Sequence, residues 1–349
     1  MTATVVIGSD WPSGIGPETM LLGVPLLRRQ VLAAGRAGFE RILVEPIRGA
    51  DLAPLLSGTR GEVLSESGGG AARLPAATLA RPSWLESLRE GGTEEPPAGV
   101  QFDIRGPEDL PGAEKWLLSG LIKEKEGFLS RHFERKISLA VSRLLASTSV
   151  TPNAMTLFSV GVGLLGASFF LTERVATQVT GSLLFLAHSI LDGCDGELAR
   201  LKFQESRFGG VLDFWGDNVV HCAVFGAIAL GWWRAASGPL PLLLGAAAIA
   251  GTLFSAGFVY FQTMRRPREG PLFVSVTRSA RTRLARVADA LARRDFIYLV
   301  VLLSLFGKAR WFLIAAAVGA PAFSLVLLGI ALAGRQAAPK LESADRSYS

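Results

Sequence analysis

The feature that most constrains this chain is a series of long apolar segments after residue 150. Six blocks contain no Asp, Glu, Lys or Arg: residues 155–172, 178–191, 218–233, 239–261, 296–307 and 311–334. A helix needs about 20 apolar residues to cross the ~30 Å hydrocarbon layer of a bilayer, and most blocks approach that length with their polar ends. Because lipid offers no hydrogen bonds to the backbone, we expect six transmembrane helices. The fifth block is short, and we expect its helix to begin within residues 288–295.

Basic residues are distributed unevenly between the loops that join these blocks. With six spans both termini lie on one side, and the loops of that side hold Arg200, Lys202, Arg207 and nine arginines between Arg265 and Arg294. The opposite loops hold only Arg174, Arg234, Lys308 and Arg310. The positive-inside rule therefore places both termini on the cytoplasmic side of the cell (inner) membrane. The formal net charge of +6 suits anionic lipids and phosphate groups, so we expect no nucleic acid partner.

The first part of the chain has the pattern of a small cytoplasmic α/β domain. Residues 2–8 and 39–46 predict strands, and residues 25–38 predict a helix that ends at Gly38. Residues 67–100 are rich in Gly, Pro and charge, which is typical of a linker. We therefore expect four parts in the chain: an α/β domain with linker over 1–112, an amphipathic juxtamembrane segment over 113–150, a membrane domain over 151–334 and a cytoplasmic tail over 335–349.

Four aspartates lie where the second and third spans meet the cytoplasm. Asp192 and Asp195 are three residues apart, and Asp213 and Asp217 are four apart, so each pair shares one face of a helix. If these helices are antiparallel neighbours, the four carboxylates converge. Two divalent cations would relieve their repulsion, and ligands that are all oxygen favour Mg²⁺ or Mn²⁺. The spacing thus predicts a two-metal site for phosphoryl-group chemistry, with the ion or proton path of a transporter as the alternative.

The same stretch resembles the signature of the CDP-alcohol phosphotransferase family. The matching positions are Asp192, Asp195, Gly196, Ala199, Arg200, Gly209, Asp213 and Asp217. Residues 151–156 also resemble the entry to the first span of that family. The resemblance implies a mainly α fold in which all four aspartates bind two metal ions and Asp217 is also the general base. His188 and His221 lie one turn from the aspartates, and their pattern favours hydrogen-bonded packing.

The resemblance further implies the substrates. The donor would be a CDP-alcohol, and the residues that would contact it are Asn153, Thr156, Gly196, Ala199, Arg200, Ser206 and Gly209. The acceptor would be an alcohol or a phosphorylated polyol whose hydroxyl attacks the β-phosphorus and releases CMP. The protein would act as a homodimer among membrane lipids.

The front segment resembles sugar-nucleotidyltransferases over residues 23–44 and 102–118. The whole chain is thereby similar to the fused arrangement of an inositol-phosphate cytidylyltransferase and a di-myo-inositol-phosphate phosphate synthase, so a synthase that uses CDP-inositol is the alternative activity. Residues 8–20 contain no basic side chain, however, and Arg105 stands where a second acidic ligand would follow Asp103. We therefore expect a shortened, degenerate domain that does not bind CTP.

Overall fold

The computed structural model describes residues 4–64, 72–91, 95–122, 133–236, 238–264 and 296–336. The chain forms two compact units. The first, here called the amino-terminal unit, combines residues 1–126 with residues 139–150 and 197–204, and the second, the helical unit, holds the rest. A short stretch from the middle of the sequence therefore belongs to the amino-terminal unit. The expected boundaries at residues 112 and 150 stay predictions.

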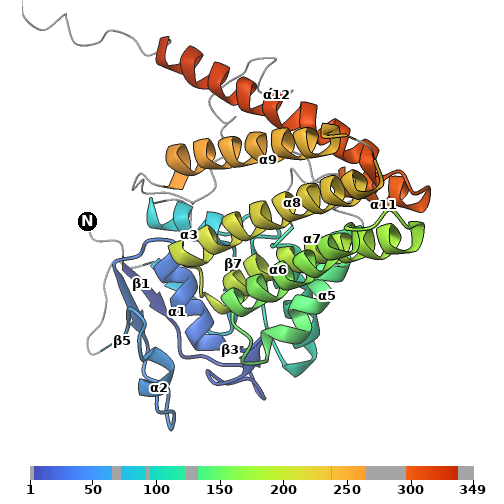
Figure 1. The fold of residues 1–349 in the computed structure, drawn as a ribbon. Coiled ribbons are helices and arrows are strands. Elements are labelled where there is room, and N and C mark those ends of the chain that lie inside the picture. The colour runs from blue at the N-terminus through green and yellow to red at the C-terminus, as the bar shows by residue number, and fades with distance from the viewer. Residues whose placement is uncertain are drawn as a thin grey trace, which may run out of the picture. The chain divides into compact units, whose positions relative to one another are not determined.

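A four-stranded parallel sheet lies at the centre of the amino-terminal unit (Figure 1). Its strands follow the order β5 (Gly61–Val63), β4 (Arg41–Val44), β1 (Thr4–Ile7) and β6 (Ala72–Leu74). Helix α1 (Leu26–Arg36) joins β1 to β4 in the chain and buries one face in the core of the unit. The turn after it passes through Gly38, whose φ of +87° favours glycine. The two expected strands and the expected helix are confirmed.

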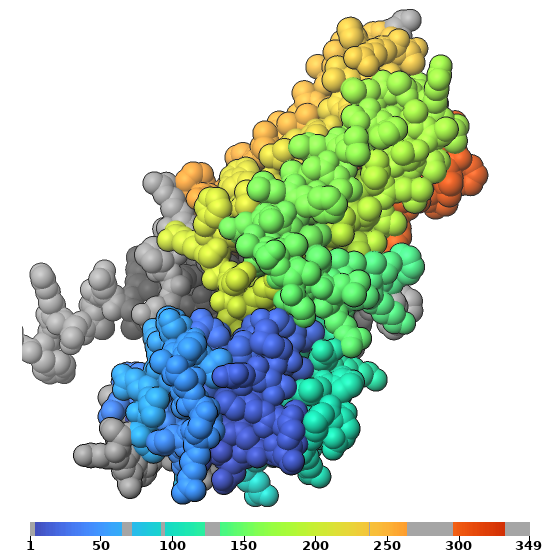
Figure 2. Space-filling model, turned by 90° about the horizontal axis from the view of Figure 1, so that it is seen from below, coloured from blue at the N-terminus to red at the C-terminus, as the bar shows by residue number. Residues whose placement is uncertain are grey.

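Smaller elements complete this unit. They are the antiparallel pairs β2 (Met20–Leu21) with β3 (Val24–Pro25) and β7 (Thr78–Ala80) with β8 (Gln101–Asp103), the helices α2 (Ala53–Leu56), α3 (Pro82–Arg89), η1 (Pro107–Asp109) and α4 (Leu110–Ser119), and most of α5 (Arg135–Ala146). Two clusters of buried apolar side chains lie inside the unit, and Figure 2 shows the outer surface of its first strands and helices in blue. The unit therefore has a core of its own.

The expectation of a linker over residues 67–100 is wrong for the part of that range that the structure describes. Strands β6 and β7 and helix α3 lie there, and Leu74, Leu79, Trp84, Leu85 and Leu88 are buried in the core. Glycine and proline predict a loop, but Pro82 is the first residue of α3. At that position the backbone N–H has no partner within the helix, so a proline, which lacks the N–H, costs no hydrogen bond. The apolar residues of α3 recur at helical spacing, which was the signal of a folded segment.

The helical unit consists of long helices. They are α6 (Pro152–Phe169), α7 (Val175–Lys202), α8 (Arg207–Ala235), α9 (Leu240–Val259), the π-helical turn η3 (Tyr260–Met264), α11 (Phe296–Leu305) and α12 (Ala309–Gln336). Helix α8 packs against α6 and α9, and α9 packs against α12 (Figure 1). The last turns of α7, from Glu197, belong to the amino-terminal unit.

Among the described residues, four helices are long and apolar enough to cross a membrane. They span Pro152–Phe169, Arg207–Ala235, Leu240–Thr263 and Ala309–Ala331. The expected second span lies within the 28-residue α7, and the expected fifth corresponds to the 10-residue α11. Its expected start at residues 288–295 and the nine arginines of residues 265–294 lie outside the described residues. The helices indicate a multi-pass membrane protein, and the count of six spans stays a prediction.

Two glycines bring α6 and α7 close together. A Cβ atom added to Gly166 would lie 3.0 Å from the carbonyl oxygen of Gly181, and one added to Gly181 would lie 2.8 Å from the carbonyl oxygen of Gly166. Small residues allow such close backbone contact between membrane helices. The contact holds α7 beside α6, so that side chains further along the two helices can meet.

Candidate active site

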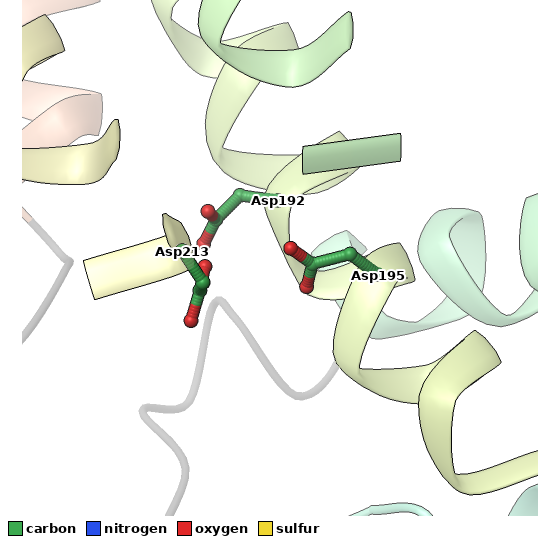
Figure 3. A group of neighbouring side chains, drawn as sticks. All are labelled: Asp192, Asp195 and Asp213. Atoms are coloured by element: carbon green, nitrogen blue, oxygen red, sulfur yellow. The ribbon is translucent and has the colours of Figure 1, made fainter. Parts of the chain in front are cut away.

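Three aspartates converge between α7 and α8 (Figure 3). Asp192 and Asp195 come from α7 and Asp213 from α8, and each offers a carboxylate oxygen within 4.8 Å of the other two. Asp192 is only 4% exposed and Asp195 only 6%. Carboxylates so close and so buried repel one another, and a divalent cation would offset both the repulsion and the loss of water. The predicted convergence is observed for these three side chains, and their role as ligands stays a prediction.

Asp217 lies one turn further along α8 and has a different neighbour. Its Oδ1 is 3.3 Å from Nε2 of His188 on α7. The other ring nitrogen of His188, Nδ1, is 2.9 Å from the backbone oxygen of Ser159 and therefore donates to it. In a neutral imidazole Nε2 then carries the lone pair, which faces Asp217. Asp217 is also close enough to Asp195 and Asp213 for their charges to interact.

Thr156 and Gly196 both bind Asp195. The Thr156 hydroxyl, 2% exposed, donates to Oδ2 of Asp195, and the backbone N–H of Gly196 donates to Oδ1. Each oxygen of this buried carboxylate therefore has a donor, which fixes the orientation of the side chain. The resemblance assigned Thr156 and Gly196 to the donor substrate. The structure gives each of them a direct contact with an aspartate of the site, and their contact with a donor stays a prediction.

Three other expected donor contacts gather where α6 and α8 begin. Ser206 caps α8, since its Oγ accepts a hydrogen bond from the backbone N–H of Gly209 at 3.0 Å. A Cβ atom added to Gly209 would lie 2.9 Å from Oδ1 of Asn153 in the first turn of α6. Asn153, Ser206 and Gly209 are thus neighbours at two helix N-termini, the ends that attract phosphate groups.

Ala199 and Arg200, the remaining expected contacts, lie in the part of α7 that belongs to the amino-terminal unit. Arg200 lines a cavity of that unit, and the carbonyl of Ala199 accepts a hydrogen bond from the backbone N–H of Gln204 at 2.9 Å. Their contact with a donor stays a prediction.

Sequence reasoning missed Glu197, which lies inside the signature. Its side chain is fully buried, and the Ser142 hydroxyl donates to it at 2.6 Å. A glutamate in a polar stretch suggests a solvated side chain, and only its position between Gly196 and Leu198 on the buried face of α7 hinted otherwise. Of the two histidines, His221 packs its ring edge-on against Phe185, whereas His188 reaches Asp217.

The second half of the chain is similar in sequence to known proteins. Residues 149–334 match the family model described as CDP-alcohol phosphatidyltransferase. A bifunctional IPC transferase and DIPP synthase of Rubrobacter xylanophilus is 34% identical over 195 residues, which cover 55% of this chain and 43% of that protein. A protein of the same name from Thermococcus kodakarensis is 38% identical over 128 residues, 36% of this chain and 28% of that protein. The chain therefore spans less than half the length of these relatives.

A solved structure is also similar to this chain. It is the phosphatidylinositol phosphate synthase of Mycobacterium tuberculosis in complex with manganese and citrate, with 19% sequence identity and a TM-score of 0.36 over 55% of this chain and 88% of that one. The family match is the decisive finding, because it includes all four aspartates and covers more than half of the 349 residues. The carboxylates that converge between α7 and α8 are thus part of a chain that belongs to the CDP-alcohol phosphatidyltransferase family.

Proposed function

We propose that this protein transfers a substituted phosphate from a CDP-alcohol to an acceptor hydroxyl and releases CMP. The observation that carries the proposal is the group of three aspartates with the Asp217–His188 contact beside it. Membership of the family supports the reaction class. Such a site has one set of carboxylates suited to divalent cations and a further carboxylate suited to accept a proton.

The donor atoms fit hard divalent cations. All three clustered side chains of the candidate centre are carboxylates, with no Cys or His among them, and two are almost completely buried. In this proposal Asp192, Asp195 and Asp213 hold Mg²⁺ or Mn²⁺, and Asp217 completes the position of a second ion. When bound, the ions neutralise the negative charge of the diphosphate and of the leaving group. Thr156 keeps Asp195 in the orientation that a ligand needs.

Asp217 is the general base of the proposed reaction. It accepts the proton of the acceptor hydroxyl while the oxygen of that hydroxyl attacks the β-phosphorus. The new phosphorus–oxygen bond forms, the bond from the β-phosphorus to the bridging oxygen breaks, and CMP leaves with that oxygen. His188 stabilises the protonated form of Asp217, because its Nδ1–H is held by the Ser159 carbonyl and the lone pair of Nε2 then accepts a hydrogen bond from the carboxyl proton. The N-termini of α6 and α8, with Asn153 and Ser206, would hold the donor nucleotide.

The acceptor is the least constrained part of the proposal. The names of the two bifunctional relatives favour a phosphorylated inositol as acceptor and CDP-inositol as donor. CDP-diacylglycerol with an alcohol acceptor is the other combination. Purified protein should be screened for CMP release with each donor against inositol, inositol phosphate and glycerol phosphate.

We also propose the topology and assembly that the sequence predicts. The protein would span the inner membrane six times as a homodimer, with both termini and the active site in the cytoplasm. The basic residues of the loops and the apolar helices support this arrangement. Labelling of single cysteines placed at residue 2 and at the exposed residue 308 in sealed vesicles tests it, because opposite accessibility is expected.

Metal dependence tests the central proposal. Excess chelator should abolish CMP release, and Mg²⁺ or Mn²⁺ should restore it where Ca²⁺, with its looser coordination, does not. Asp213→Asn should raise the metal concentration needed for half-maximal rate, and Asp103→Asn, an aspartate of the amino-terminal unit, is the matched control. Full activity in excess chelator would refute the proposal and favour the transporter.

The amino-terminal unit is proposed to be catalytically inactive. In the loop after β1, the backbone N–H and the hydroxyl of Ser9 both donate to Glu45 at 3.1 Å, and Glu45 also pairs with Arg73. The loop donors and the Arg73 cation are therefore already occupied by a carboxylate, so a triphosphate would have to displace Glu45 to bind them. Asp103 accepts a hydrogen bond from Thr78 at 2.8 Å. We expect the full-length protein to release no pyrophosphate from CTP and inositol phosphate.

A further inference from the structure

The amino-terminal unit contains a cavity of about 140 Å³, here called the arginine cavity. Most of its walls are apolar and come from strands β6 and β7 and from helices α1, α3 and α4. The rings of Trp116 and Phe203 form part of these walls. Four arginines also line the cavity: Arg29, Arg36, Arg81 and Arg200. Cations placed around an apolar cavity need a compensating anion or extensive hydrogen bonding.

Arg29 is the most buried of these cations, with 4% of its surface exposed. Within the part of the chain that the structure describes, its guanidinium donates to carbonyl oxygens, those of Leu201 at 3.1 Å and Leu21 at 2.7 Å being the closest. Its Nε has no hydrogen-bond partner among the described residues. Burial, together with the charge of Arg36, lowers the pKa of Arg29 to about 10, so the side chain is still charged at neutral pH. The cavity therefore has a buried positive charge that the described carboxylates do not neutralise.

Arg81 supplies a second cation beside a flat ring. Its Nη2 donates to the carbonyl of Trp116 at 2.8 Å and to the hydroxyl of Ser119 at 3.0 Å, and its Cζ lies 3.8 Å from the centre of the Trp116 ring. Neither hydrogen bond goes to a carboxylate. On the other wall, Arg36 lies over the ring of Phe203 at 4.5 Å. A guanidinium stacked on a ring can still donate from its edge, as Arg81 does, and an anion can accept from the same edge.

Gln30 lines the same cavity with a side chain of fixed orientation. Its Nε2 donates to the carbonyls of Pro75 at 3.0 Å and Thr78 at 2.9 Å. These two hydrogen bonds hold the amide in place, so this wall of the cavity is already ordered before a ligand binds.

We propose that the arginine cavity binds a small organic phosphate monoester. Its phosphate would pair with Arg29 and Arg81, and a ring-sized body would pack against Trp116 and Phe203. A phosphate monoester carries nearly two negative charges, which matches the two guanidinium groups, and its oxygens suit their planar donors. A cavity near 150 Å³ can hold a group as large as benzene. This site is distinct from the aspartate site and does not depend on the proposed phosphotransfer.

The test is calorimetric titration of the full-length protein in detergent. The probes are phenyl phosphate, inorganic phosphate and phenol, and phenyl phosphate should bind at least ~10-fold more tightly than either of the others because only it supplies both features. Arg81→Met should weaken phenyl phosphate binding at least ~10-fold. Arg28→Met is the matched control, because it also removes one arginine from the unit. Arg28 lies on α1 outside the cavity lining and donates to the carbonyls of Leu55 and Ser57, so this variant should bind phenyl phosphate as the wild type does.

Two further measurements keep the proposal falsifiable. Arg81→Lys retains the charge, so it should bind phenyl phosphate more tightly than Arg81→Met even if both variants unfold at a lower temperature. Dihexanoyl phosphatidic acid should compete with phenyl phosphate for the site. If the lipid binds more tightly than phenyl phosphate, the natural ligand is a lipid headgroup; if it binds more weakly, the natural ligand is a soluble phosphate monoester. Absence of saturable binding, or equal binding by wild type and Arg81→Met, would overturn the proposal.

Discussion

The substitution Thr156→Val separates two possible roles of one side chain. Thr156 was expected to meet the donor nucleotide, but its hydroxyl donates to Oδ2 of Asp195. Valine has nearly the same shape and lacks the hydroxyl, so the change removes the hydrogen bond with little effect on packing. If Thr156 serves the metal site by orienting Asp195, the loss should appear in the dependence of the rate on metal concentration. If it serves the nucleotide, the loss should appear in the KM of the donor.

The expected size follows from the burial of the two groups. A hydrogen bond to a charged group contributes about 1.5–3 kcal/mol, and both Thr156 and Asp195 are nearly fully buried, so water cannot replace the lost donor. Because about 1.4 kcal/mol corresponds to a factor of ten, the concentration of Mg²⁺ for half-maximal CMP release should rise by ~10-fold to ~100-fold. Substitutions of residues that orient metal ligands have effects of this size.

The assay is CMP release by purified protein over a series of Mg²⁺ concentrations, with the donor saturating. Ser159→Ala is the matched control on the same helix, because among the described residues the Ser159 hydroxyl donates to the neutral Thr156 carbonyl alone, at 2.8 Å. The control should change the metal dependence by less than about threefold, as expected for loss of a neutral hydrogen bond. A Thr156→Val protein with an unchanged metal dependence and a raised donor KM would refute the reasoning.

Three further predictions concern other contacts of the helical unit. Asp217→Asn should lower turnover by ~10² or more while donor binding, measured by titration, is largely kept. His188→Phe should lower kcat by about tenfold with little change in KM, and His221→Phe, a ring that packs against Phe185, should stay near wild type in the same assay. Gly166→Val should destabilise the protein by about 1–3 kcal/mol through overpacking against Gly181, which lowers the midpoint of thermal unfolding. A Cβ atom added to Gly161 meets no atom within 4 Å, so Gly161→Val should be close to neutral.

The parts of the site that follow from local spacing were predictable. Asp192 and Asp195 had to share a face of α7 because three residues make nearly one helical turn, and Asp213 followed on the next helix after a short connection. Strands β1 and β4 and helix α1 were predictable for the same reason, since the pattern of apolar residues matched the period of each element.

The parts that depend on packing between distant segments were not predictable. His188 faces Asp217 only because α6, α7 and α8 pack together, and Ser159 on α6 then selects the protonated nitrogen. No spacing of residues in the sequence predicts that contact. The folded segment around α3 was missed because its strands are three residues long and lie among glycines and prolines, so the burial of Trp84 and Leu85 became clear only in the structure.

The amino-terminal unit has a structural task that requires no catalysis. It includes the end of α7, and several contacts hold that segment: Arg29 donates to the Leu201 carbonyl, and Lys202 donates to the carbonyls of Thr148 and Val150. Glu197, buried within the family signature, accepts a hydrogen bond from Ser142 on α5. These contacts use the side chains of Arg29, Lys202 and Ser142, and none of them needs a bound nucleotide. The unit can therefore keep its fold around the end of α7 without any nucleotide-binding residue.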